Sequence, residues 1–101
     1  MSDRELLELA AKAAGYVLQE TEDGYECNFD DSRIWNPLTD DGDALRLAVK
    51  FRMSVFHSLS DVYVVDDDGD IEVEEGHKRD PLAATRRAIV RVAAEIGRGM
   101  T

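Results

Sequence analysis

Apolar residues recur at helical spacing in three stretches of the chain. The first stretch predicts a helix over residues 3–14. Ser2 and Glu5 have the spacing of a capping box, and Gly15 stands where a left-handed residue commonly ends a helix. The side chains expected on its buried side are Leu6, Leu9, Ala10 and Ala13.

Two further helices carry start signals of their own. One begins near Thr39, because the aspartates that follow are favourable at the positive end of a helix dipole. The other begins at Asp80-Pro81, an N-cap acceptor followed by the proline that fits the first helical position, and ends at Gly97 and Gly99. The side chains expected to face the core are Ala44, Leu45, Leu47, Ala48, Val49 and Phe51 in the second helix and Leu82, Thr85, Ile89, Val92, Ala93 and Ile96 in the third.

Alternating apolar residues predict a hairpin after the first helix. One strand covers residues 16–20, and Asp23-Gly24 supplies the two positive φ angles of a tight turn. The second strand alternates its apolar positions, which are Tyr25, Cys27 and Phe29. Residues 30–39 are expected to be irregular, because Asn36-Pro37 interrupts regular structure there.

Residues 53–75 predict three more strands. The run 62–65 is apolar at every position and indicates a central strand covered on both faces. Ile71 and Val73 alternate with acidic residues, as in an edge strand, and Asp68-Gly69 predicts the turn before them. The strand near residues 53–59 includes His57, which is expected to be partly buried.

These elements define the expected fold class. A chain of 101 residues fits a single domain, residues 1–101, with one hydrophobic core. The order α-β-β-α-β-β-β-α predicts an α+β protein: a compact α/β sandwich in which a mostly antiparallel sheet is packed by helices.

Charge and cysteine content narrow the class of protein. The net charge is −10, yet residues 1–75 carry 20 acidic and 6 basic side chains whereas residues 76–101 carry 2 acidic and 6 basic ones. Excess negative charge disfavours general affinity for nucleic acids. The lone Cys27 suits a reducing compartment. Neither a signal-peptide core nor a run of about 20 apolar residues is evident, so no membrane association is expected.

Three segments together resemble a known family. The segment Trp35-Asn36-Pro37-Leu38-Thr39-Asp40-Asp41-Gly42-Asp43-Ala44-Leu45-Arg46-Leu47-Ala48, the stretch 80–90 and the opening 6–16 are similar to the phage ABA sandwich family of small bacteriophage and prophage proteins. The resemblance covers nearly the whole chain. It implies a small phage-encoded α/β sandwich acting in the cytoplasm of the bacterial host. It implies no activity, because the family is one of unknown function.

Several groups of residues could bind a metal ion or act in catalysis, but a structural role explains each of them better. The acidic run 66–75 places carboxylates as an EF-hand loop does, but position 1 would be Val64 and the flanks are strand-like. Two histidines, His57 and His77, with one distant cysteine are poor evidence for zinc. Cys27 alternates with aromatic residues, which favours a buried apolar role over nucleophilic catalysis. We therefore predict no enzyme activity, no cofactor and no metal.

The best candidate for an interaction surface is the last helix. Its arginines lie opposite the predicted core stripe, and Ala83, Val90 and Ala94 form a second apolar strip that another helix could approach, from the same chain or a second copy. A tryptophan in an irregular loop either anchors a partner or fills a core edge. The candidate interaction surface is Trp35, Arg86, Arg87, Val90 and Arg91.

Two functions follow as hypotheses. The first is a non-enzymatic protein-interaction module, a phage accessory protein that forms a homodimer or binds a host protein. An acidic DNA mimic is one variant of it. The second is a nucleic-acid-binding accessory protein that uses the basic residues Lys78, Arg79, Arg86, Arg87 and Arg91.

Overall fold

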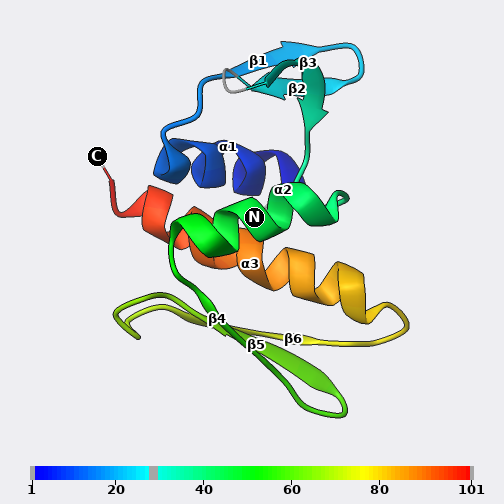
Figure 1. Cartoon of the computed structure of the whole chain (residues 1–101), viewed down its shortest axis with the longest axis vertical. Coiled ribbons are helices and arrows are strands. Elements are labelled where there is room, and N and C mark those ends of the chain that lie inside the picture. The colour runs from blue at the N-terminus through cyan, green and yellow to red at the C-terminus, as the bar shows by residue number, and fades with distance from the viewer. Residues whose placement is uncertain (1, 28–29, 101) are drawn as a thin grey trace.

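In this computed structural model, a layer of three helices lies between two three-stranded antiparallel sheets (Figure 1). The structure describes residues 2–27 and 30–100, and their side chains except those of residues 30–33. The helices are α1 (Asp3–Ala14), α2 (Asp41–Lys50) and α3 (Pro81–Arg98). One sheet has the order β1-β2-β3 and comprises β1 (Leu18–Thr21), β2 (Gly24–Cys27) and β3 (Asp30–Trp35). The other has the order β4-β5-β6 and comprises β4 (Ser54–His57), β5 (Asp61–Val65) and β6 (Glu72–Gly76). The predicted α+β sandwich is confirmed, with one more strand than expected.

The helix termini follow the predicted capping. Ser2 and Glu5 form a complete capping box at the start of α1, and Gly15 ends that helix with a φ of 78°. The side chain of Asp40 accepts the backbone N–H of Asp43 at the start of α2. Asp80 does the same for Ala83 at the start of α3. Local capping therefore decides where all three helices begin.

The first and last helices pack against each other at very short range. Of the two glycines predicted to end α3, Gly99 forms the C-cap, whereas Gly97 lies within the helix, which runs on to Arg98. A Cβ atom on Gly97 would collide with the carbonyl oxygen of Leu9. Only a residue without a side chain allows the two backbones to come this close.

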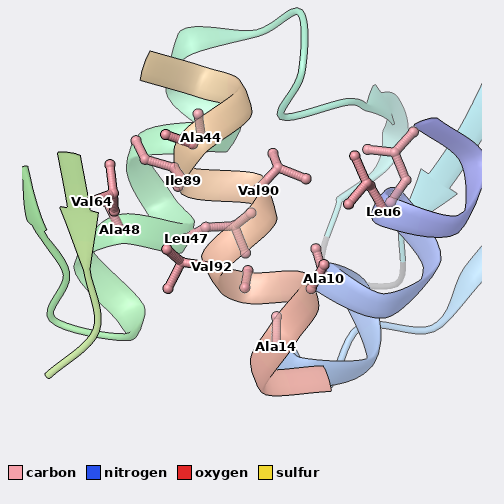
Figure 2. Close-up of a cluster of buried hydrophobic side chains, with 14 of the residues drawn as sticks. Leu6, Ala10, Ala14, Ala44, Leu47, Ala48, Val64, Ile89, Val90 and Val92 are labelled. Carbon is pink, nitrogen blue, oxygen red and sulfur yellow. The ribbon is translucent and has the colours of Figure 1, made fainter. Parts of the chain in front are cut away.

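The second apolar strip of α3 is part of this contact. Val90 is fully buried on the side of α3 that faces α1 (Figure 2). Ala94 of the same strip is buried as well. On the other side of α3, Ile89 faces Val64 of β5 and the helix α2 (Figure 2). The helix that approaches the strip thus comes from the same chain.

The region 30–39 was predicted to be irregular, but β3 occupies its first part. β3 pairs antiparallel with β2, and the register shifts between Glu26 and Cys27. Four of its residues, 30–33, are polar or charged, so no apolar alternation marks the strand. Of the apolar positions predicted for the strand before it, Cys27 is buried, whereas Phe29 lies outside the described residues.

The turn between β1 and β2 lies one residue earlier than predicted. Thr21 pairs with Gly24, so Glu22 and Asp23 are the central residues of the turn. Gly24 has a φ of 133°, but Asp23 is not among the described residues with positive φ. The glycine therefore serves the strand after the turn rather than the turn itself.

A short network of hydrogen bonds, which we call the polar lock, joins β3 to α2. Asn36 turns the chain by accepting the backbone N–H of Leu38 with its side-chain oxygen, at 3.0 Å. The carboxylate of Asp43 is fully buried and accepts the backbone N–H of Asn36 at 3.0 Å, and Arg46 donates to the same carboxylate at 3.1 Å. Pro37 is also fully buried. The segment 35–48, one of the three that carry the family resemblance, thus connects the end of β3 to α2.

The sheet β4-β5-β6 covers the opposite side of the helices. Val62 and Val64 of the central strand are fully buried against α3, whereas the alternate residues Asp61, Tyr63 and Val65 are half-buried. Only one face of the strand is therefore covered, not both as predicted. The predicted turn at Asp68-Gly69 is present, with a φ of 77° at the glycine. All four residues of β4 are exposed, so His57 is not partly buried as predicted.

Three predicted core side chains are exposed instead. Leu45 and Val49 on α2 and Leu82 on α3 have relative exposures of 62%, 68% and 63%. Only the side of α2 that carries Ala44, Leu47 and Ala48 is buried. In residues 2–27 and 30–100 no helix combines the length and the apolar character that crossing a bilayer requires.

Substituting Gly97 tests the close helix contact. Gly97→Ala should lower the free energy of unfolding by about 2–3 kcal/mol or more, because the new methyl group collides with the backbone of Leu9. Gly99→Ala is the matched control: its Cβ would be 3.5 Å from the nearest atom, so stability should hold or rise slightly. Urea denaturation measures both, and equal effects would contradict the packing argument.

Substituting Asp43 tests the polar lock. Asp43→Ala should cost about 2–3 kcal/mol, because the backbone N–H of Asn36 and the side chain of Arg46 lose a buried acceptor. Asp41→Ala removes an exposed carboxylate from the same helix turn and should cost less than about 1 kcal/mol. Thermal unfolding followed by circular dichroism compares the two; a larger loss for Asp41→Ala would refute the assignment.

Candidate functional site

Two of the five residues predicted to form an interaction surface are not at the surface. Trp35 and Val90 are both buried, with exposures of 2% and 0%. The ring of Trp35 packs edge-on against Tyr16, with the ring centroids 5.8 Å apart. Trp35 therefore fills a core edge, the second of the two roles considered for it.

Arg86 serves the fold rather than a surface. Its Nε donates to the carbonyl oxygen of Leu38 at 2.8 Å, and its Nη1 contacts the carboxylate of Asp41 at 2.7 Å. These contacts tie α3 to the junction before α2. Only 16% of the Arg86 side chain is exposed, which leaves little of it for a partner.

Arg87 and Arg91 remain at the surface and share a carboxylate. Nη1 of Arg91 contacts Glu75 of β6 at 2.5 Å, and Nε of Arg87 lies 3.8 Å from the same oxygen. Nη1 of Arg87 also contacts Asp3 of α1 at 3.0 Å. The pair thus marks the place where α1, α3 and β6 meet.

A groove of about 530 Å³ opens at this meeting point. We call it the arginine groove. One wall is α3, the other is the start of β6 with the two residues before it, and Leu6 of α1 contributes an apolar side chain. Its lining residues are Leu6, Asp70, Ile71, Glu72, Val73, Arg87, Arg91, Glu95 and Arg98. Leu6, Ile71, Val73 and Glu95 were not predicted as site residues, because their proximity depends on how α3 crosses the sheet.

The two walls of the arginine groove differ in charge. Three of the four residues from α3 are arginines, whereas both charged residues from the strand side are acidic, Asp70 and Glu72. The face of the sheet that points away from the helices is also acidic: the Glu74 carboxylate raises the pKa of the Tyr63 phenol, with smaller effects of Asp61 and Glu72. The α3 wall of the groove therefore carries a net positive charge, and each of its arginines also contacts a carboxylate, in Asp3, Glu75 or Glu95.

The other candidate groups do not assemble into the sites considered from the sequence. In the acidic turn, the carboxylate of Asp66 accepts the backbone N–H of Ile71 at 3.1 Å, as a turn residue does. Cys27 is buried in the first sheet, whereas His57 and His77 belong to the second, so no cysteine–histidine pair forms. Within the described parts of the chain, no three His, Cys, Asp or Glu side chains are grouped to hold a metal ion.

Fold and groove together define an α+β protein whose central helices are enclosed by two antiparallel sheets and whose last helix borders an arginine-lined groove. Comparison with protein-family models, with curated proteins and with solved structures finds no match for this chain. The resemblance to the phage ABA sandwich family therefore stays a prediction from the sequence.

Removing the charge of Glu75 tests whether its ion pairs with Arg87 and Arg91 hold β6 against α3. Glu75→Gln should lower the free energy of unfolding by about 1 kcal/mol, because Arg87 and Arg91 lose a largely shielded partner. Glu72→Gln, an exposed neighbour on the same strand, should change stability by less than about 0.5 kcal/mol. Urea denaturation at low salt measures the difference; an equal effect of the two variants would argue against the shared ion pair.

Proposed function

We propose that this protein is a non-enzymatic protein-interaction module whose arginine groove binds an extended segment of a partner protein. The observation that carries the proposal is the juxtaposition of an edge strand with a row of arginines. β6 is the last strand of its sheet, and Arg87, Arg91 and Arg98 of α3 lie beside it in one groove.

An edge strand provides the backbone half of such a recognition site. The outer edge of β6 has no neighbouring strand in the described parts of the chain, so its N–H and C=O groups are available to an added strand. Strand addition to a sheet edge is a recurring way of binding peptides: backbone hydrogen bonds supply affinity and flanking side chains supply specificity.

The register of the sheet defines what side chains the partner needs. Val73 and Glu75 lie on the helix-facing side of β6, since they pair with Val64 and Val62. Glu72 and Glu74 lie on the opposite face. Because side chains alternate between faces, every second residue of an added strand would face the arginines of α3. The best partner therefore carries acidic residues at these positions and neutral or basic residues between them.

Within residues 2–27 and 30–100 no cysteine–histidine pair is assembled, which supports the non-enzymatic part of the proposal. The only cysteine is buried and lies in a different sheet from the two histidines. The phage-like segments 6–16, 35–48 and 80–90 support a role as a phage accessory protein in the cytoplasm of a bacterial host. The apolar strip of α3 does not support a homodimer, because α1 covers that strip.

A peptide selection tests the proposal. Random peptides displayed on a surface and selected on the immobilised protein should converge on extended sequences with acidic residues at alternate positions. Arg98→Glu should weaken the selected peptides at least ~10-fold, because it reverses a charge in the groove. Arg98 contacts Glu95 of its own helix at 3.5 Å, so this variant leaves the ion pairs of Arg87 and Arg91 intact.

Arg4→Glu is the matched control. Arg4 is also exposed and paired, with Glu20 at 2.8 Å, but it lines a different part of the surface. It should leave peptide affinity unchanged. Peptides that bind Arg98→Glu as tightly as the wild-type protein would overturn the proposed site. Salt-sensitive binding of an oligonucleotide, with no peptide enrichment, would instead favour the nucleic-acid hypothesis.

A further inference from the structure

The two histidines of the chain meet at one end of the second sheet. Nδ1 of His57 lies 3.5 Å from Nε2 of His77, although the residues are 20 positions apart. His57 ends β4 and pairs with Val62, and His77 follows β6 directly. β5 lies between these two strands, so the register of the sheet brings the rings together.

The distance between the two nitrogens is that of two ligands on one metal ion. A hydrogen bond between ring nitrogens would be close to about 2.9–3.0 Å, so 3.5 Å is long for one. Two imidazole nitrogens that each lie about 2.0–2.1 Å from a tetrahedral ion are about 3.4 Å apart. The ring centroids are 5.6 Å apart, so the rings extend away from the two facing nitrogens, as two ligands of a shared ion do.

Backbone hydrogen bonds fix the position of His77 beside the start of β5. The N–H of His77 donates to the carbonyl oxygen of Ser60 at 2.7 Å, which anchors it to the start of β5. Lys78 has a φ of 52°, and Asp80 donates its N–H back to His77, so the chain turns sharply right after the ring. His57 is exposed and His77 half-buried, which leaves access for an ion from solution.

We propose that His57 and His77 form a two-histidine binding site for a borderline divalent transition-metal ion, Zn²⁺ or Cu²⁺. Imidazole nitrogen suits these ions, whereas Mg²⁺ and Ca²⁺ require oxygen ligands. No group of three candidate ligands exists among the described residues, so water completes the coordination. Two protein ligands, with Lys78 and Arg79 next in the chain, make this a micromolar rather than a structural site. The site is independent of the arginine groove.

Zinc titration by calorimetry tests the site. The wild-type protein should bind one Zn²⁺ with a dissociation constant in the micromolar range, and ring proton signals of both histidines should shift together in NMR spectra. His57→Gln and His77→Gln should each weaken binding at least ~10-fold, because each leaves a single imidazole. The double variant should show no binding at this site. Both side chains lie at the surface, so the variants should melt at the wild-type temperature.

Asp68→Asn is the control, since it removes a carboxylate from the acidic turn at the opposite end of β5 and β6. It should leave zinc affinity unchanged, and Mg²⁺ should not compete. Three results would overturn the proposal: no zinc binding below about 1 mM, a loss of affinity in only one of the histidine variants, or an equal loss in Asp68→Asn.

Discussion

The close contact between α1 and α3 is the constraint on which the rest of the structure depends. Its closest point is Gly97, where a methyl group would overlap the backbone of Leu9. Along the same face, small buried residues such as Ala10 and Ala94 let the two helices approach over their length. With α1 on one side and α2 on another, α3 becomes the central element, and the second sheet packs against it as well. The arginine groove exists because α1, α3 and β6 meet at this centre.

The helices were predictable because their signals are local. Ser2, Asp40 and Asp80 act as caps within one turn of the residues they mark. β3 was not predictable, because its polar residues form a strand only by pairing with β2. Leu45 and Val49 have the right spacing for a core face, but which side of α2 is covered depends on the layers around it. Helical periodicity therefore predicted the elements correctly and some of their buried faces incorrectly.

The same division holds for the candidate sites. Arg87 and Arg91 could be found from the sequence, because an arginine face on a helix is a local pattern. Their partner Glu75 could not, since its contact with α3 requires the twist and register of a sheet. His57 and His77 are a clearer case. Their proximity depends on two strand pairings, and no residue beside either histidine in the sequence indicates that the two rings meet. Trp35 illustrates the reverse, a conspicuous residue whose role is to fill space beside Tyr16.

The two sheets lie on opposite sides of the helices, so neither shields the other from water (Figure 1). The first sheet is held to the helices chiefly by Trp35, Cys27 and the lock at Asn36, whereas the second has two fully buried valines on its central strand. Opening the first sheet thus breaks fewer contacts with the helices and leaves α3 packed on β5 and β6. Its amide protons should exchange through local opening, at lower free energy than global unfolding, while those of β5 should persist until the whole domain unfolds. The buried side chains form one cluster, yet the two sheets are expected to differ in stability.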